Sequence, residues 1–436
     1  MIKKHVLPVL IGSVLTAGSA YAGPLADLYR LALENDPQLK QAEAQFMAGQ
    51  EAPIQGRAAL LPSAGLTANT SDSSAGSRSS GYSVSLTQPL FAASDYYNFK
   101  RSELLAEQAT LQFDLAQQQL IQRSINAYLG VLRAQSTLDN ALAQERALQR
   151  RLEQVNAQFE VGLIAITDVQ EAQASFDNAV VLRIDAEGAL ENSFEALERL
   201  AGSSVAQVAP LRADYPIQSV EPTTPALWLE KALQGNLELR LADLQSDAAR
   251  RNVQSKRSAH LPSVNLGLSH QNSRIHGDSS RSGWEDDNRI SLNLSLPLYA
   301  GGAISSAQRQ AEHEQIASGH FVEDTKRAVT ETTRSLLRTL QTSVQSVKAR
   351  EQSILSRETA LRATEEGFNV GTRNVVDVLQ AEQALYEAKL AYANARIDHI
   401  LALFNFKQTL GTLSPSDLIA LDEWLDLDAD SLISDL

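Results

Sequence analysis

Apolar residues recur at two different spacings along this chain, and each spacing predicts a different element. In the longer segments the spacing is four and three, which is typical of the buried face of an amphipathic helix. Examples are Leu148, Leu152, Val155 and Phe159, and Ile121, Ile125, Tyr128 and Leu132. All 13 prolines lie outside residues 90–209 and 298–414. Both windows can therefore be helical without interruption, and a single helix from Ser94 to Val161 would be about 100 Å long.

A glycine that follows a valine divides each window near its middle. These residues are Gly162 and Gly371, and a new amphipathic segment begins after each of them. Glycine adopts the left-handed backbone conformation that commonly ends a helix. We therefore expect each window to form a long helical hairpin with its tip at the Val-Gly pair.

Outside these windows apolar residues alternate with small polar ones, and a period of two predicts a β-strand. The alternating residues are Tyr82, Val84 and Leu86; Val264, Leu266 and Leu268; and Ile290, Leu292, Leu294, Leu296 and Leu298. Strands of about nine to eleven residues with one apolar face suit a bilayer-spanning barrel. The same pattern equally suits a soluble amphipathic hairpin that packs on a core. The segments Ser71–Ser80 and Asn272–Asp287 are expected to be water-facing loops.

The same order of motifs occurs twice in the chain. Leu61-Pro62-Ser63 recurs as Leu261-Pro262-Ser263, and Phe159-x-Val161-Gly162 recurs as Phe368-x-Val370-Gly371. A period of about 200 residues is the size of a duplicated domain-scale unit. We therefore divide the chain into a leader 1–22, a first repeat 23–201, an irregular inter-repeat linker 202–224, a second repeat 225–413 and an acidic tail 414–436. The sequence leaves the role of the tail open.

Each repeat carries two expected strands, which gives four strands in the chain. Four strands cannot close a barrel wide enough for passage, so a barrel would require several chains. Aromatic side chains stand near the expected strand ends, where the aromatic belt of a membrane protein would lie. These residues are Tyr82, Phe91, Trp284 and Tyr299.

Residues 1–22 have the order of a secretory signal peptide: Lys3 and Lys4, then an apolar run, then a small-residue site that ends in Ala22. Cleavage after Ala22 would yield an exported protein. The chain has a net charge of −14 and no cysteine. The acidic balance argues against nucleic acid as a partner, and the lack of cysteine excludes disulfides, thiolate metal sites and a cysteine nucleophile.

No motif of a catalytic or cofactor site stands out. The sequence has no HExxH spacing, no P-loop and no GxSxG elbow. We therefore expect no enzyme activity, no cofactor and no bound metal. A second alternative is a soluble periplasmic coiled-coil adaptor or structural protein, which would not carry a pair of alternating strands in each repeat.

The second hairpin tip and the helix after it resemble a known family. The segments are Phe368-Asn369-Val370-Gly371-Thr372-Arg373-Asn374-Val375-Val376-Asp377-Val378-Leu379, Leu385-Tyr386-x-Ala388-Lys389, Ala393-x-Ala395-Arg396 and Leu410-Gly411-Thr412-Leu413. With Phe159–Gln170 from the first repeat, they resemble the TolC family of outer-membrane efflux and secretion channels. The resemblance covers nearly all of the chain after residue 22.

This resemblance implies a mixed α and β membrane protein. Three identical chains, each giving four strands, would close one twelve-stranded β-barrel in outer-membrane lipid, and the helical hairpins would form a coiled-coil tunnel across the periplasm. The implied function is the exit duct of a tripartite efflux pump or a type I secretion system. Its partners would be a periplasmic adaptor (membrane fusion) protein and an inner-membrane pump or ABC exporter.

The resemblance also implies a gate at the periplasmic end of the tunnel. Arg373 would bridge to Asp168 within a chain and to Thr167 across chains. A gate tyrosine of the family corresponds to Phe368, which cannot donate a hydrogen bond. Asp377 would form an acidic ring that favours cations. The preference for cations would be weakened, because this chain has the uncharged Gln380 at the family's next acidic position.

The hairpin tips would contact the adaptor through Val161, Gly162, Leu163, Val370, Gly371 and Thr372. A simpler alternative accounts for both aspartates without a gate. Asp168 and Asp377 lie near the start of new helices, where the helix dipole and free N–H groups favour a carboxylate.

Overall fold

The computed structural model describes residues 23–72, 78–205, 208–222, 224–276 and 283–426. The predicted signal peptide and residues 427–436 of the acidic tail lie outside the described residues. The chain forms two compact units. One unit takes the described residues up to Pro37, Gln118–Trp228 and those from Thr333 on, and the other takes Gln38–Gln117 and Leu229–Thr332. Each compact unit therefore combines segments of both sequence repeats, whereas the duplication alone suggested one structural unit in each repeat.

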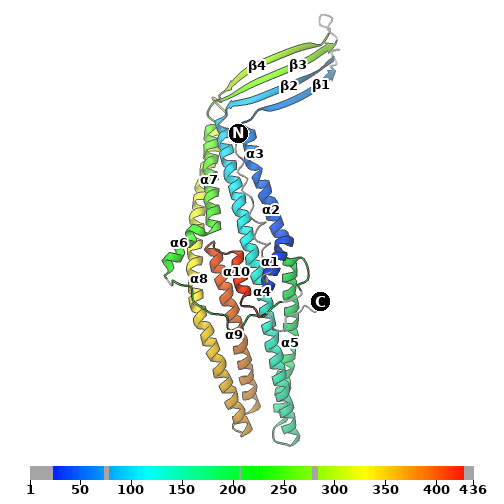
Figure 1. The fold of residues 1–436 in the computed structure, drawn as a ribbon, viewed down its shortest axis with the longest axis vertical. Coiled ribbons are helices and arrows are strands. Elements are labelled where there is room, and N and C mark those ends of the chain that lie inside the picture. Colours follow the sequence, from blue (N-terminus) through cyan, green and yellow to red (C-terminus); the bar gives the residue numbers. More distant parts are fainter. Residues whose placement is uncertain (1–22, 73–77, 206–207, 223, 277–282, 427–436) are drawn as a thin grey trace. The chain divides into compact units, whose positions relative to one another are not determined.

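Both halves of the chain contain short helices, then two strands, then a long helical hairpin (Figure 1). In the first half they are α1 (Pro24–Asn35), α2 (Pro37–Gln50), α3 (Ala52–Ala58), β1 (Ser63–Asp72), β2 (Arg78–Phe91), α4 (Ala93–Glu160) and α5 (Ile166–Ala201). In the second half they are α6 (Pro225–Gly235), α7 (Leu237–Ser258), β3 (Ser263–His276), β4 (Glu285–Ser295), α8 (Ala303–Asn369), α9 (Val375–Thr409) and α10 (Pro415–Asp422).

The long helices are as the proline-free windows predict. Helix α4 has 68 residues and α8 has 67, and each returns through a short turn into α5 or α9. The prediction of two long helical hairpins is confirmed. None of the helices in the described residues is both long and apolar enough to cross a membrane.

The four strands form one antiparallel sheet in the order β1-β2-β3-β4. The central pair, β2 with β3, joins the first repeat to the second. Two predictions about strand ends are wrong. The hairpin loops are shorter than expected, because β1 extends to Asp72 and β3 extends to His276. Strand β4 ends at Ser295 and does not continue to Leu298, since Pro297 has no N–H group to donate to a ladder.

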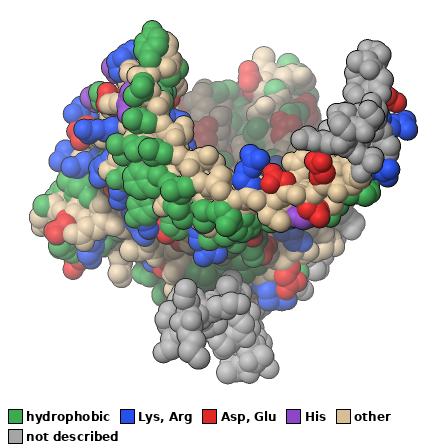
Figure 2. All heavy atoms as spheres, turned by 90° about the horizontal axis from the view of Figure 1, so that it is seen from above, with side chains coloured by type: hydrophobic (Ala, Val, Ile, Leu, Met, Phe, Trp, Pro, Cys, Tyr) green, Lys and Arg blue, Asp and Glu red, His purple; other side chains and the backbone are tan. Residues whose placement is uncertain are grey.

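The register places the apolar residues of all four strands on one face. Leu66 pairs with Val84, Leu86 with Leu268, and Leu268 with Ile290, and directly paired residues point to the same side of a sheet. The opposite face carries small polar pairs such as Ser85 with Ser269. Figure 2 shows the hydrophobic side chains gathered in a band, with charged side chains toward the hairpin loops.

Three of the four predicted strand-end aromatic residues lie where expected. Phe91 ends β2, Trp284 immediately precedes β4, and Tyr299 follows β4 with 88% of its surface exposed. Tyr82 differs, because it lies inside β2 and pairs with Asn272 of β3.

The core of the unit that contains Gln118–Trp228 includes residues of both the linker and the start of the tail. Tyr128 of α4 donates a hydrogen bond to the carbonyl of Ala209 and accepts one from its N–H group. Leu211 of the linker forms a β-bridge with Leu425 of the tail. The linker is irregular, as predicted, but these bonds fix it on α4 and join it to the tail.

Candidate functional site

The two hairpin tips have the same backbone geometry. Gly162 and Gly371 have φ angles of 76° and 79°, in the left-handed region that the sequence predicted. In the first tip the N–H of Leu163 donates to the carbonyl of Gln158 at 2.9 Å. In the second, the N–H of Thr372 donates to Gly367 at 2.8 Å. Such bonds satisfy the free carbonyls at a helix end.

Each tip is followed by a helix whose first turn holds one of the predicted aspartates. Asp377 accepts a hydrogen bond from the N–H of Asn374 at 3.3 Å, and Asn374 accepts one from the N–H of Asp377 at 2.8 Å. Asp168 accepts from the N–H of Ala165 at 3.4 Å. The simpler explanation of these aspartates, as partners of a helix N-terminus, is therefore confirmed. A further role at a gate is compatible with it, because each carboxylate has additional acceptor sites.

Arg373 lies in the turn of the second tip and pairs with the first turn of α9. Its guanidinium is 3.8 Å from the carboxylate of Asp377 and 61% of its side chain is exposed. Among the described residues no ion pair joins Arg373 to Asp168 in the single chain. Arg373 is therefore positioned near an acidic residue of its own hairpin, and its predicted bridges to Asp168 and Thr167 stay predictions.

The second tip has a local feature that the first lacks. A Cβ atom on Gly367 would lie 2.8 Å from the Cγ atom of Arg373 and 3.2 Å from the hydroxyl of Thr372. The corresponding residue of the first repeat is Gln158. The absence of a side chain at Gly367 therefore allows the aliphatic part of Arg373 to fold back over the end of α8.

The tips themselves present apolar side chains to solvent. Val161, Leu163 and Val370 are 69%, 73% and 72% exposed. Thr167 is exposed as well, whereas Phe368 is half-buried. Three large exposed apolar side chains at two adjacent turns form a surface suited to a partner protein.

Beneath the tips an apolar cluster joins the two hairpins. Its buried members are Leu148 and Val155 of α4, Val169, Ala172 and Ala179 of α5, and Val375 and Leu379 of α9. Phe368 packs against this cluster. The Phe368 ring therefore contributes packing between the hairpins.

A buried charged cluster lies among the same helices, beside the apolar cluster. Arg151 of α4 donates to Glu382 of α9 at 2.9 Å, contacts Glu365 of α8, and donates to Gln154 at 2.8 Å. Only 9% of the Arg151 side chain and 6% of the Glu382 side chain are exposed. Burial raises the pKa of Glu382, and Arg151 opposes that shift by favouring the ionised form.

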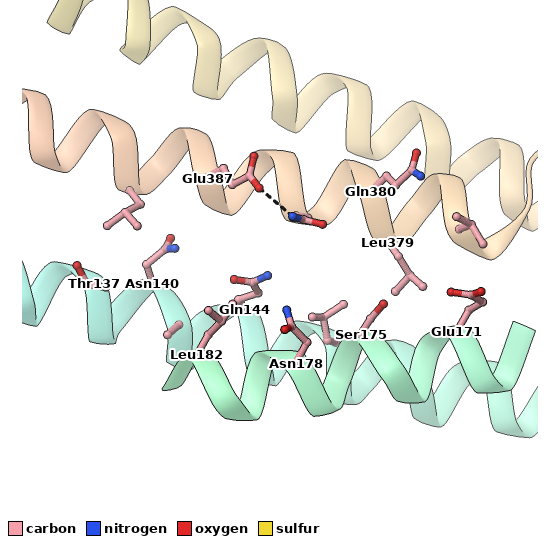
Figure 3. A pocket seen from close by; sticks show the side chains of 15 residues that line it. Thr137, Asn140, Gln144, Glu171, Ser175, Asn178, Leu182, Leu379, Gln380 and Glu387 are labelled. Atoms are coloured by element: carbon pink, nitrogen blue, oxygen red, sulfur yellow. Dashed lines mark hydrogen bonds between the residues drawn. The ribbon is translucent and has the colours of Figure 1, made fainter. Parts of the chain in front are cut away.

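A pocket of about 370 Å³ lies between α4, α5 and α9 (Figure 3). Gln380 lines it together with Glu171, Ser175, Asn178 and Glu387. Gln383 donates a hydrogen bond to Glu387 across one turn of α9 at 2.9 Å. Gln380 therefore faces a space lined by both polar and apolar side chains.

The structure brings together part of the predicted site and adds residues that sequence reasoning missed. Arg373 meets Asp377, and Phe368 meets the cluster under the tips. The cluster of Arg151, Glu365 and Glu382 was not predicted. The signal present was a basic residue between Leu148 and Val155 of an apolar helix face, but its acidic partners are more than two hundred positions away.

Comparisons with known proteins agree with this geometry. The outer membrane efflux protein family matches residues 28–203 and 228–412, one stretch in each half of the chain. The outer membrane protein TolC of Vibrio cholerae is 39% identical over 426 residues, covering 95% of this chain and 97% of the relative. The alkaline protease secretion protein AprF of Pseudomonas aeruginosa is 31% identical over 440 residues, covering 96% and 91%.

A solved structure has the same fold. The outer membrane protein VceC of Vibrio cholerae matches with a TM-score of 0.77 at 18% identity, covering 89% of this chain and 96% of that chain. At this identity the likeness concerns the fold, namely long helical hairpins with a four-stranded sheet. The family match extends over most of the sequence, and the curated relatives match along nearly their whole length. This protein belongs to the outer membrane efflux protein family.

Proposed function

We propose that this protein is the gated exit duct of a tripartite efflux pump or a type I secretion system, and that it works as a homotrimer. Its family is that of outer-membrane export channels, which excludes the alternative of a soluble periplasmic adaptor. The relatives include TolC proteins and a protease secretion protein. The nature of the cargo and the identity of the inner-membrane pump are set by partners that the sequence does not name.

The observation that carries this proposal is the sheet of four strands with two open edges. In the described structure β1 and β4 each pair with a single neighbouring strand. One face exposes large apolar residues, with Ile290 78% and Leu66 70% exposed. An apolar outer face and unpaired edges are both satisfied when several chains join their sheets in lipid. Three chains would give twelve strands around a polar lumen.

The proposed gate lies at the hairpin tips. In the closed trimer Arg373 would bridge to Asp168 of its own chain and to Thr167 of the neighbouring chain. The weak, exposed pair with Asp377 leaves Arg373 able to change partner, because such pairs contribute only about 0.2–1 kcal/mol. Three Asp377 side chains around the axis would favour the entry of cations.

The partners follow from the position of the tips. The exposed residues Val161, Leu163 and Val370 would dock a periplasmic adaptor, which links the duct to an inner-membrane pump or ABC exporter. Gly162, Gly371 and Thr372 would fix the shape of this surface. Such a docking event could open the gate by pulling Arg373 away from Asp168 and Thr167.

Single-channel conductance of the purified protein in a planar bilayer tests the duct and the gate together. We expect small, cation-selective steps from the wild type and larger or more frequent openings from Arg373→Ala. If the Arg373 contacts of each of the three chains stabilise the closed state by about 0.2–1 kcal/mol, their loss would raise the open-to-closed ratio between about threefold and about a hundredfold.

Arg362→Ala serves as the matched control, because Arg362 is an exposed arginine of α8, seven positions before the end of the helix that leads into the second tip. Unchanged openings in Arg373→Ala would overturn the gate and leave the duct standing. Correctly folded protein that never conducts would overturn the duct itself.

A further inference from the structure

The start of helix α1 rests on a buried carboxylate from the other end of the chain. The N–H of Leu25 donates to one oxygen of Asp422 at 3.0 Å, and the N–H of Ala26 donates to the other at 2.8 Å. Asp422 is the last residue of α10 and is 8% exposed. Both residues belong to the same compact unit, so this contact is part of one core.

Gly23 lies directly against the same carboxylate. A Cβ atom built on Gly23 would be 2.4 Å from the Cγ atom and 2.6 Å from one oxygen of Asp422. This Cβ atom and the backbone nitrogen of Gly23 are both bonded to the Cα atom of Gly23, so the nitrogen also lies within a few ångströms of the carboxylate. Gly23 is also the residue that follows the expected cleavage site at Ala22.

Among the residues that the structure describes, no basic side chain forms an ion pair with Asp422. Its pKa is raised to about 6, chiefly by burial; the two N–H donors oppose this shift, and the charge of nearby Asp27 on α1 adds to it. The charge of Asp422 also helps to raise the pKa of Tyr128 on α4. Lys407, the basic residue near α10, pairs with Asp417 at the opposite end of that helix.

We propose that removal of residues 1–22 creates an ion pair between the new α-ammonium group of Gly23 and the carboxylate of Asp422. Hydrolysis of the Ala22–Gly23 peptide bond releases the leader with a carboxylate and leaves Gly23 with a protonated amine. The processed N-terminus then supplies the cation that Asp422 lacks. Asp422 is thus a binding site for the mature chain's own terminus, and after removal of the leader the ion pair adds to the hydrogen bonds from Leu25 and Ala26.

The direction of the pKa changes follows from this pairing. A nearby cation favours the ionised carboxyl and lowers the pKa of Asp422, and the carboxylate raises the pKa of the α-amine above its usual value of about 7.7–8.0. An amine with a raised pKa is mostly protonated at neutral pH. It reacts slowly with acylating reagents, because only the neutral amine has the free electron pair that attacks the acyl carbon.

The α-amine can be measured without interference from lysine. Trypsin releases Gly23–Arg30, a peptide that contains no lysine, so an acyl label on it reports the terminus alone. The assembled protein in detergent is labelled briefly at a series of pH values, and the label is quantified by mass spectrometry. We expect the midpoint of labelling in the wild type to lie about 1–3 pH units above that of Asp422→Asn.

Glu423→Gln is the matched control, since it removes the same charge from the adjacent residue, whose side chain is exposed. Its midpoint should equal that of the wild type. A merely buried terminus would react more slowly at every pH with no change of midpoint, and this result would overturn the proposal. So would an intact mass showing that the mature chain does not begin at Gly23.

A second variant keeps Asp422 in place in case its replacement prevents folding. One serine inserted between Ala22 and Gly23 moves the α-amine about 3.5 Å along the chain. We expect its labelling midpoint to fall toward that of a free amine. A midpoint unchanged from the wild type would contradict the ion pair, and neither result depends on whether the protein conducts.

Discussion

At the scale of single residues, Arg151 has the largest expected effect on stability. It is a nearly buried cation between two helical hairpins, and Glu382 beside it is a buried anion. We predict that Arg151→Met lowers the free energy of unfolding by about 3–5 kcal/mol, because it leaves Glu382 buried without a partner. The measurement is urea-induced unfolding of the detergent-solubilised protein at pH 7.

The double variant Arg151→Met with Glu382→Leu tests the cause of that loss. Replacing both members of a buried pair by apolar residues is often nearly neutral, so we expect most of the stability to return. Arg30→Met is the control, because the Arg30–Asp27 pair is about half exposed on both sides and should contribute less than about 1 kcal/mol. A double variant no more stable than Arg151→Met would show that packing, and not the unpaired charge, is responsible.

At the scale of elements, the tips depend on one backbone conformation. Gly371 has a φ of 79°, and a Cβ atom there would meet nothing within 4 Å. The effect of Gly371→Ala is therefore backbone strain alone, which we expect to destabilise the protein by about 1–2 kcal/mol. Gly188→Ala is the matched change inside α5, where a Cβ atom also meets nothing, and it should stabilise by about 0.5–1 kcal/mol.

Urea midpoints of the two glycine variants, measured side by side, separate strain from volume. Opposite signs would confirm that the left-handed residue, and not the size of the added methyl group, fixes the turn. If both variants were equally destabilised, the added Cβ atoms would have to clash with neighbours that the single chain does not contain, such as other chains of an assembly.

Elements whose cause is local were predictable from the sequence. The long helices of the two hairpins, the αL glycines and the helix-start aspartates each depend on neighbours within a few positions, and all are found. The two faces of the sheet were predictable, because apolar and polar residues that alternate along each strand stay on opposite faces when the strands pair. Strand ends were less so, since Asp72 and His276 extend strands into segments that composition assigned to loops.

Features built from distant residues could not be predicted. The contact of Arg151 with Glu365 and Glu382 needs three helices, and the bridge of Leu211 with Leu425 joins the linker to the tail. No local pattern specifies which distant residue a side chain will meet. The same reason applies to the gate, whose predicted bridge from Arg373 to Thr167 requires a second chain.

At the scale of the whole molecule, the open edges of the sheet make a prediction about assembly. Thr67 of β1 and Ser291, Asn293 and Ser295 of β4 all lie on the polar face of the sheet. The chain contains no cysteine, so any introduced pair is the only possible disulfide. We predict that Thr67→Cys, combined with Cys at one of the three β4 positions, oxidises to a covalent trimer.

The three β4 positions cover three registers, and a disulfide needs Cα atoms about 4.4–6.8 Å apart, so one combination should react well and the other two poorly. The readout is a non-reducing gel of detergent-solubilised protein. A closed ring of three chains should give a covalent trimer and no larger product. Ser85→Cys with Ser269→Cys is the control, because these residues are register partners within one chain and should give an oxidised monomer. An oxidised control without trimers in any register would mean that β1 and β4 do not meet between chains, and a ladder beyond three chains would mean that the sheet continues without closing.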